Sequence, residues 1–197
     1  MKNIYLDFET TGLNILKCEP IEISVLFTED YKVIDKITKY IKFEKKWEDL
    51  SDEELSALKF NKILSSEDLD NHNSKAYYFK EVLKELLEKT KKFSSKKISI
   101  SGWNNSVFDI TILLRAVMRE NIYIYDYFDY HARDVMCMFI PYYELEFENK
   151  LKSLSLREVH KFLIGTIKDE EFHNAEIDCL ATIDIDKWIH KRIKENN

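Results

Sequence analysis

Alternating apolar and polar residues predict that the chain opens with strands and continues with helices. Three β-branched, apolar runs come first, at residues 3–8, 21–27 and 33–43. Glu29 and Asp30, which separate the second run from the third, have the composition of a hairpin turn. Short apolar runs at residues 97–101 and, less regularly, 122–125 predict further strands. Apolar residues at helical spacing predict four helices, at residues 80–92, 108–120, 156–163 and 175–194.

Two sequence features predict helices in the first half of the chain. Ser51 and Glu54 form a capping box before an amphipathic stretch, and Val82, Leu83, Leu86 and Leu87 share one helical face. Residues 49–75 are polar and rich in Ser and Asn, so we expect an irregular or mobile surface region that could border a substrate groove. Strands followed by alternating strands and helices predict an α/β domain with a mixed sheet, antiparallel first and parallel later.

Composition favours one compact domain over residues 1–197. Hydrophobic residues make up 45% of the 197, with three Gly and two Pro, which is typical of a packed globular protein. The net charge of -6 excludes a broadly basic surface, although an enzyme that holds its substrate through metal ions needs only a local basic rim. Cys18, Cys137 and Cys179 show no zinc-site spacing and are expected to be reduced, packed thiols. No membrane-length or signal-like apolar run is present, so we expect an intracellular, cytoplasmic protein.

Two acidic residues on the first strand are the first candidates for chemistry. Asp7 and Glu9 are two positions apart on a strand, so both face one side of the sheet while Phe8 faces the other. Two carboxylates at that distance repel each other, which makes the pair most useful when cations lie between them. Alone, such a pair is more often an exposed strand face than a site.

Two later segments favour a functional site over an exposed strand face for Asp7 and Glu9. The run Gly102-Trp103-Asn104-Asn105-Ser106-Val107-Phe108-Asp109 follows a strand and opens a helix, so that Asp109 can return to the first strand. The run His173-Asn174-Ala175-Glu176-Ile177-Asp178 opens the last long helix, with the histidine at its start and the aspartate one turn further on. Together with Asp7-Phe8-Glu9-Thr10-Thr11-Gly12-Leu13, these segments resemble the DEDD (DnaQ-like) 3′-to-5′ exonuclease superfamily, in its DEDDh branch. The middle segment looks most like that of exodeoxyribonuclease I, whereas many relatives carry a shorter Gly-His-Asn version.

The resemblance implies a fold, a set of ligands and a base. It implies a ribonuclease-H-like α/β fold, with a central mixed β-sheet flanked by α-helices. It also implies that two divalent cations, Mg²⁺ or Mn²⁺, are bound by Asp7, Glu9, Asp109 and Asp178, and that His173 is the general base. Carboxylate oxygens suit those ions, and an imidazole near neutral pKa can take a proton from water.

The resemblance further implies how a nucleic-acid end is bound. Residues matching Thr10, Thr11 and Gly12 lie in the turn that approaches the terminal 3′-hydroxyl, and the residue matching Leu13 wedges against the last base. Phe108 could stack on a base, although core packing is the commoner role for it and for Trp103. The expected partner is therefore nucleic acid with a free 3′ end, single-stranded DNA or RNA.

The same residues leave alternatives open. The chain could be a polymerase-associated proofreading or repair subunit, or a nucleic-acid-binding module that has lost catalysis. Glycoside hydrolysis by Asp7 and Glu9 would leave Asp109, Asp178 and His173 unexplained. The remaining histidines are expected to be structural or surface residues, and Asp134 is expected to have a structural role. Those histidines are His72, His131, His160 and His190.

Overall fold

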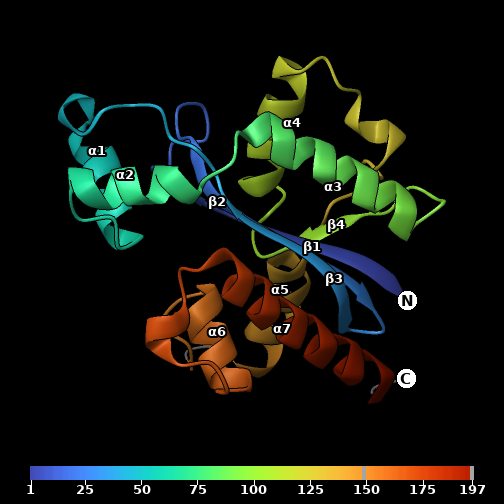
Figure 1. Ribbon diagram of the computed structural model, residues 1–197. Coiled ribbons are helices and arrows are strands. Elements are labelled where there is room, and N and C mark those ends of the chain that lie inside the picture. The colour runs from blue at the N-terminus through green and yellow to red at the C-terminus, as the bar shows by residue number, and fades with distance from the viewer. Residues whose placement is uncertain (148–149, 196–197) are drawn as a thin grey trace.

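A mixed five-stranded sheet forms the centre of the computed structural model, which describes residues 1–147 and 150–195 (Figure 1). Its strands are β1 (Lys2–Thr10), β2 (Pro20–Glu29), β3 (Lys32–Tyr40), β4 (Ile100–Gly102) and β5 (Arg133–Asp134). They lie in the order β3-β2-β1-β4-β5. β2 pairs antiparallel with β1 and β3, whereas β4 pairs parallel with β1 and β5. The predicted mixed sheet, antiparallel at the start and parallel later, is confirmed.

Helices cover both faces of this sheet. In the described ranges the α-helices are α1 (Asp52–Phe60), α2 (Ser66–Lys75), α3 (Phe79–Phe93), α4 (Asp109–Arg119), α5 (Val135–Glu146), α6 (Leu156–Leu163) and α7 (Ala175–Glu195). Three short 3₁₀ helices accompany them: η1 (Trp47–Asp49), η2 (Ile124–Asp126) and η3 (Asp169–Glu171). Figure 1 shows α3 and α4 on one face, α5, α6 and α7 on the other, and α1 and α2 at one end. None of the helices in the described part of the chain is long and apolar enough to cross a membrane.

Strand β1 divides the core into two layers. Ile4, Leu6 and Phe8 are buried in the cluster that contains the apolar faces of α3 and α4. Tyr5 points the other way, into the cluster formed with α5, α6 and α7. Because side chains alternate along a strand, Asp7 and Glu9 share the side of Tyr5 and face α7. The predicted opposition of Phe8 to the two carboxylates is confirmed.

A third, smaller core holds α1 and α2 against the end of the sheet. Its buried members are Ile21, Phe43, Leu58, Ile63 and Leu69. Ser51 caps α1 in the predicted capping box, with Glu54 bonding back to the Ser51 backbone amide at 3.0 Å. Each fully buried leucine stabilises this attachment by roughly 1.5 to 3 kcal/mol. The prediction of an irregular region at 49–75 is therefore wrong, because these residues form two short helices that bury Leu58 and Leu69.

Other local predictions also need correction. The hairpin turn between β2 and β3 is formed by Asp30 and Tyr31, both with positive φ (50° and 65°), one residue later than expected. Residues 122–125 do not form a strand. Ile124 instead begins η2 and is buried against the core, and Arg133 and Asp134 pair with β4 instead.

Besides α2, the helix α5 was not predicted. α5 contains Pro141 and a run of aromatic residues, so its sequence shows little helical amphipathicity. Asp134 starts α5 as its N-cap. Cys137 on α5 is exposed, contrary to the expectation of packed thiols, whereas Cys18 and Cys179 are buried.

Candidate active site

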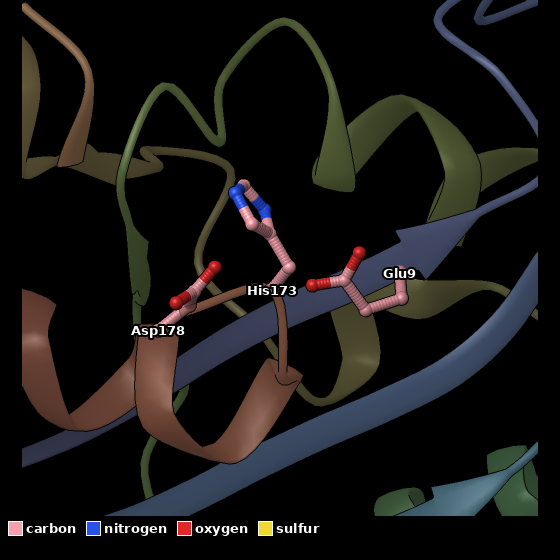
Figure 2. A group of neighbouring side chains, drawn as sticks. All are labelled: Glu9, His173 and Asp178. Carbon is pink, nitrogen blue, oxygen red and sulfur yellow. The ribbon is translucent and has the colours of Figure 1, made fainter. Parts of the chain in front are cut away.

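Carboxylates from three separate parts of the chain meet beside the middle of the sheet. Asp7 and Glu9 come from β1, Asp109 is the first residue of α4, and Asp178 lies in the first turn of α7. His173 immediately precedes α7. Figure 2 shows His173 between Glu9 and Asp178, with Glu9 on the strand and Asp178 on the helix. The sequence elements that carry the five predicted catalytic residues are thus brought to one place.

The tightest group consists of two carboxylates and the imidazole. Glu9, His173 and Asp178 each offer one ligand atom, and these atoms all lie within 4.8 Å of one another. Within residues 1–147 and 150–195, neither Asp7 nor Asp109 belongs to this group. His173 therefore lies where it could contact either a cation or a water molecule beside Glu9.

Asp109 is tied to the first strand by a hydrogen bond. The backbone amide of Phe8 donates to Oδ1 of Asp109 at 2.9 Å, although the two residues are 101 positions apart. Asp109 is buried at 3% exposure. This bond holds the α4 carboxylate between Asp7 and Glu9 along β1, as the sequence predicts.

The loop before α4 is held by Asp134. Its Oδ1 accepts from the backbone amides of Asn104, Met136 and Cys137, and its Oδ2 accepts from the amide of Ser106. One carboxylate thus caps α5 and also fixes the loop that positions Asp109, and the predicted structural role of Asp134 is consistent with these contacts.

Gly102 makes the close approach of this loop to β1 possible. A Cβ on Gly102 would lie 2.6 Å from Cβ of Asn105 and 2.9 Å from the carbonyl oxygen of Leu6. Since the second contact is with backbone, a larger residue cannot be accommodated without moving the loop or the strand.

His173 is held by backbone conformation and by ring packing. Its φ is 65°, in the left-handed region, which histidine adopts more readily than most residues. Its ring packs against Phe60 of α1 with centroids 4.1 Å apart. Asn174 caps α7 through Oδ1, which accepts from the amide of Ile177 at 3.2 Å, and its Nδ2 donates to Glu22 of β2 at 3.2 Å. The His173 segment is therefore anchored to both α1 and β2.

Burial and mutual repulsion raise the pKa values of the carboxylates. Burial, followed by repulsion from Asp178, raises the pKa of Glu9 to about 8. Burial raises the pKa of Asp109 to about 8, partly opposed by the Phe8 amide, and raises that of Asp178 to about 7. Burial, followed by repulsion from Asp109 and its neighbours, raises the pKa of Asp7 well above its ordinary value. Without a cation, this cluster resists carrying its full charge at neutral pH.

The donor set fits a hard divalent cation. Oxygen ligands predominate, as Mg²⁺ and Mn²⁺ prefer. Oδ1 of Asp178 is buried and has no hydrogen-bond partner among the described residues. A buried carboxylate oxygen without a donor is costly, and a cation would satisfy it while lowering the raised pKa values around it.

The pKa of His173 moves in the opposite direction. Burial, and after it the positive charges of Arg157 and Lys62, lower the pKa of the imidazole from its ordinary value. The neutral form, which can accept a proton, is therefore favoured at physiological pH.

An apolar pocket of about 550 Å³ opens beside Glu9 and His173. Thr10, Gly12, Leu13 and Phe108, all predicted to contact substrate, line it. Leu13 is 84% exposed, which leaves its side chain free for a ligand. Thr11 does not line this pocket: its amide donates to the carbonyl of Glu19, and its hydroxyl accepts from the Glu19 amide.

Sequence reasoning missed three residues around this site. Phe60 and Ala57 of α1 line the apolar pocket, and Phe60 also packs against His173. For Phe60 and Ala57, the sequence offered the capping box at Ser51. That motif predicts a helix but does not predict where the helix packs. Glu22 is a buried acid opposite Glu9 on β2; a glutamate inside an apolar strand was visible in the sequence.

Trp103, Phe108 and the other histidines have the following places in the structure. Trp103 packs in the α7-side core and donates from Nε1 to the carbonyl of Leu154. Phe108 both packs against the other core and lines the apolar pocket. Each of the four remaining histidines has a hydrogen-bond partner outside the site: Ile41 for His72, Asp129 for His131, Asp184 for His160 and Asp186 for His190.

Solved structures share this fold. No protein-family model matches the chain, and no curated protein matches it. The zinc-ion-bound form of an E. coli exonuclease I–ssDNA complex matches with a TM-score of 0.77 at 20% identity, over 97% of this chain and 40% of that chain. E. coli exonuclease I in complex with a dT13 oligonucleotide matches with a TM-score of 0.77 at 19% identity, over 99% and 43%. Apo exonuclease I matches with a TM-score of 0.74 at 20% identity, over 96% and 42%.

These matches confirm the predicted ribonuclease-H-like exonuclease fold and its likeness to exonuclease I. The chain spans about two fifths of the length of these exonuclease I structures.

Proposed function

We propose that this chain is a metal-dependent 3′-to-5′ exonuclease that removes nucleotides from single-stranded DNA. The observation that carries the proposal is the convergence of Asp7, Glu9, Asp109 and Asp178 with His173 at one site beside an apolar pocket. Residues 1–197 would act as a single DEDDh exonuclease domain. We name single-stranded DNA and not RNA as the proposed substrate because the solved structures with this fold include complexes with ssDNA and with a dT13 oligonucleotide.

The proposed reaction is hydrolysis of the last phosphodiester bond. A water oxygen attacks phosphorus, the bond from phosphorus to the 3′-oxygen of the preceding nucleotide breaks, and that oxygen takes up a proton. The products are a nucleoside 5′-monophosphate and a strand shortened by one residue with a new 3′-hydroxyl. His173 accepts the proton of the attacking water, for which its lowered pKa keeps it neutral.

The carboxylates would hold two divalent cations, Mg²⁺ or Mn²⁺. Asp7, Glu9, Asp109 and Asp178 supply the oxygens, and bound cations would neutralise charge on the phosphate and stabilise the attacking and leaving oxygens. The hydrogen bond from Phe8 keeps one oxygen of Asp109 occupied, which leaves its second oxygen for a cation. The raised pKa values of these acids would fall when positive charge is bound.

The apolar pocket would take the terminal nucleoside. Leu13 and Phe60 offer exposed apolar surface, 84% and 61% exposed, to a base. Base contacts of this kind tolerate any sequence. Glu9 lines the pocket, so that a terminal 3′-hydroxyl bound in it would lie close to the carboxylate cluster.

End specificity tests the proposal. We would compare three 5′-labelled substrates of equal sequence: a linear oligonucleotide with a 3′-hydroxyl, the same strand with a 3′-phosphate, and a closed circle. Shortening of the first, with slower loss of the second and an intact circle, is expected. Cleavage of the circle would establish an endonuclease and overturn the proposal, as would an inert 3′-hydroxyl strand under every divalent metal.

A further inference from the structure

A second pocket, of about 340 Å³, is also lined by His173. Its wall is formed by the end of β3, the loop between α1 and α2, one face of α2, and the segment before α7. The residues that matter for its chemistry are Tyr40, Asn61, Lys62, His72, Lys75 and Asn174. No predicted substrate residue lines it.

The two pockets adjoin at the active site. Asn61 and His173 line both of them. A strand whose terminal nucleoside filled the apolar pocket would have its scissile phosphate at His173 and the carboxylates. The nucleotides on the 5′ side of this phosphate would then lie next to the second pocket.

Tyr40 offers this pocket a fixed aromatic surface. Its side chain is 44% exposed, and its ring packs on His72 with centroids 5.0 Å apart. The imidazole is itself held, because Nε2 of His72 bonds to the carbonyl of Ile41 at 3.0 Å. A ring supported on one side and open on the other is suited to stacking on a base.

The pocket presents two lysine ammonium groups together with two carboxylates, those of Glu22 and Asp68. Lys62 and Lys75 form no ion pair with any residue in the part of the chain that the structure describes, in contrast to Lys36 and Lys45 nearby. The acids that line the same pocket are engaged by other groups. Glu22 accepts from Asn174, and Oδ2 of Asp68 accepts from the Leu64 amide and the Ser65 hydroxyl.

Aromatic and basic residues continue along the same edge. The segment at Tyr77 pairs with the end of β3, with its amide donating to the carbonyl of Tyr40 at 2.9 Å. Nζ of Lys39 lies 4.3 Å from the ring centroid of Tyr77, and Nζ of Lys42 lies 4.5 Å from that of Tyr78. Interleaved rings and ammonium groups are the combination that binds single-stranded nucleic acid without regard to sequence.

We propose that this second pocket binds the nucleotides on the 5′ side of the scissile phosphate. Tyr40 stacks on a base, and Lys62 and Lys75 contact backbone phosphates. The inference rests on the proposed exonuclease function for its orientation, and it names a strand-binding surface that is local on a chain whose net charge is -6.

Two substrates distinguish an effect on this pocket from an effect on the catalytic site. The p-nitrophenyl ester of thymidine 5′-monophosphate has a terminal nucleoside and a hydrolysable phosphate but no preceding nucleotide. A dT oligonucleotide of about twelve residues has both. For Tyr40→Ala and Lys75→Ala we expect KM for the oligonucleotide to rise about tenfold, with kcat/KM for the ester within about twofold of wild type. Tyr40→Phe keeps the ring and should restore oligonucleotide binding, and Tyr123→Ala, an exposed tyrosine outside the pocket, is the matched control.

Oligonucleotide binding, measured by fluorescence anisotropy in the presence of chelator, tests the pocket independently of catalysis. Lys62→Ala belongs in this experiment alone, because the Lys62 charge also lowers the pKa of His173. Each lysine variant should reduce the slope of log affinity against log salt by about 0.7, the value for one phosphate contact with a single strand.

The outcomes distinguish the two proposals. A wild type that binds the oligonucleotide through Lys62 and Lys75 but hydrolyses neither substrate would refute the exonuclease and leave the pocket standing. A wild type that hydrolyses both substrates, with the oligonucleotide KM unchanged in folded Tyr40→Ala and Lys75→Ala and the salt slope unchanged in folded Lys62→Ala and Lys75→Ala, would refute the pocket alone.

Discussion

Replacing Asp178 with asparagine is expected to stabilise the metal-free protein at alkaline pH. Burial raises the pKa of Asp178 from 3.8 to about 7. The folded protein therefore keeps a proton that the unfolded chain has already released, and the stability from this group falls as pH rises from about 4 through about 7. Above that range the folded state must carry a buried charge that asparagine does not have.

The size of the effect follows from the pKa shift. A change of about three pKa units corresponds to about 4 kcal/mol. Because the pKa values of interacting carboxylates belong to the group and not to one residue, we assign about half of this, about 2 kcal/mol, to Asp178 alone. For a protein of this length that corresponds to a rise in Tm of about 4 to 8 °C.

Thermal unfolding in chelator at about pH 4 and about pH 8 measures this difference. Asp178→Asn should melt above wild type at the higher pH and equally at the lower one, whereas Asp126→Asn, an exposed aspartate on η2, should match wild type at both. Magnesium at about a hundredfold over Kd should then stabilise wild type by about 2.7 kcal/mol and the variant much less. An Asp178→Asn protein that is less stable at about pH 8, or stabilised by magnesium as strongly as wild type, would refute the reasoning.

Three further predictions concern the groups around the carboxylates. Asp134→Ala removes the acceptor for four backbone amides and should lower the free energy of unfolding by about 2 to 3 kcal/mol in urea titrations, with Asp129→Ala as the near-neutral control. Gly102→Ala introduces a Cβ 2.6 Å from a neighbouring carbon and should cost about 1 to 3 kcal/mol; an unchanged Tm would contradict the close packing. Since burial lowers the pKa of His173 below 6.5, activity at saturating metal, where bound cations keep the carboxylates ionised, should rise with pH only below that value and stay level above it; a profile at saturating metal that still rises above pH 6.5 would contradict the role of His173 as the base.

The local spacing of apolar residues predicted many of the strands and helices. The two-residue spacing of Asp7 and Glu9 determines that they share a face, and the regular apolar positions of α3 appear in the core as expected. α1 and α2 were harder to predict, because each buries few residues, such as Leu58 and Leu69, in a small separate core. α5 was missed because its aromatic run and Pro141 show no clear helical period.

The candidate site was predictable in its residue types and less so in its surroundings. The position of Asp109 depends on a hydrogen bond to Phe8 across 101 positions, which spacing alone does not reveal. The packing of Phe60 on His173 depends on where α1 docks. Thr11 was expected beside the substrate, and its polar groups instead bond to Glu19, since the turn after β1 closes on itself.

The most direct test of the central claim follows 5′-labelled single-stranded DNA, with RNA of the same sequence in parallel, in magnesium, in manganese and in chelator. Wild type should produce a ladder that shortens from the 3′ end only when metal is present, and folded Asp109→Asn and His173→Ala proteins should produce none. Metal-independent shortening, or a ladder undiminished in Asp109→Asn, would contradict a carboxylate-bound metal centre as the source of activity.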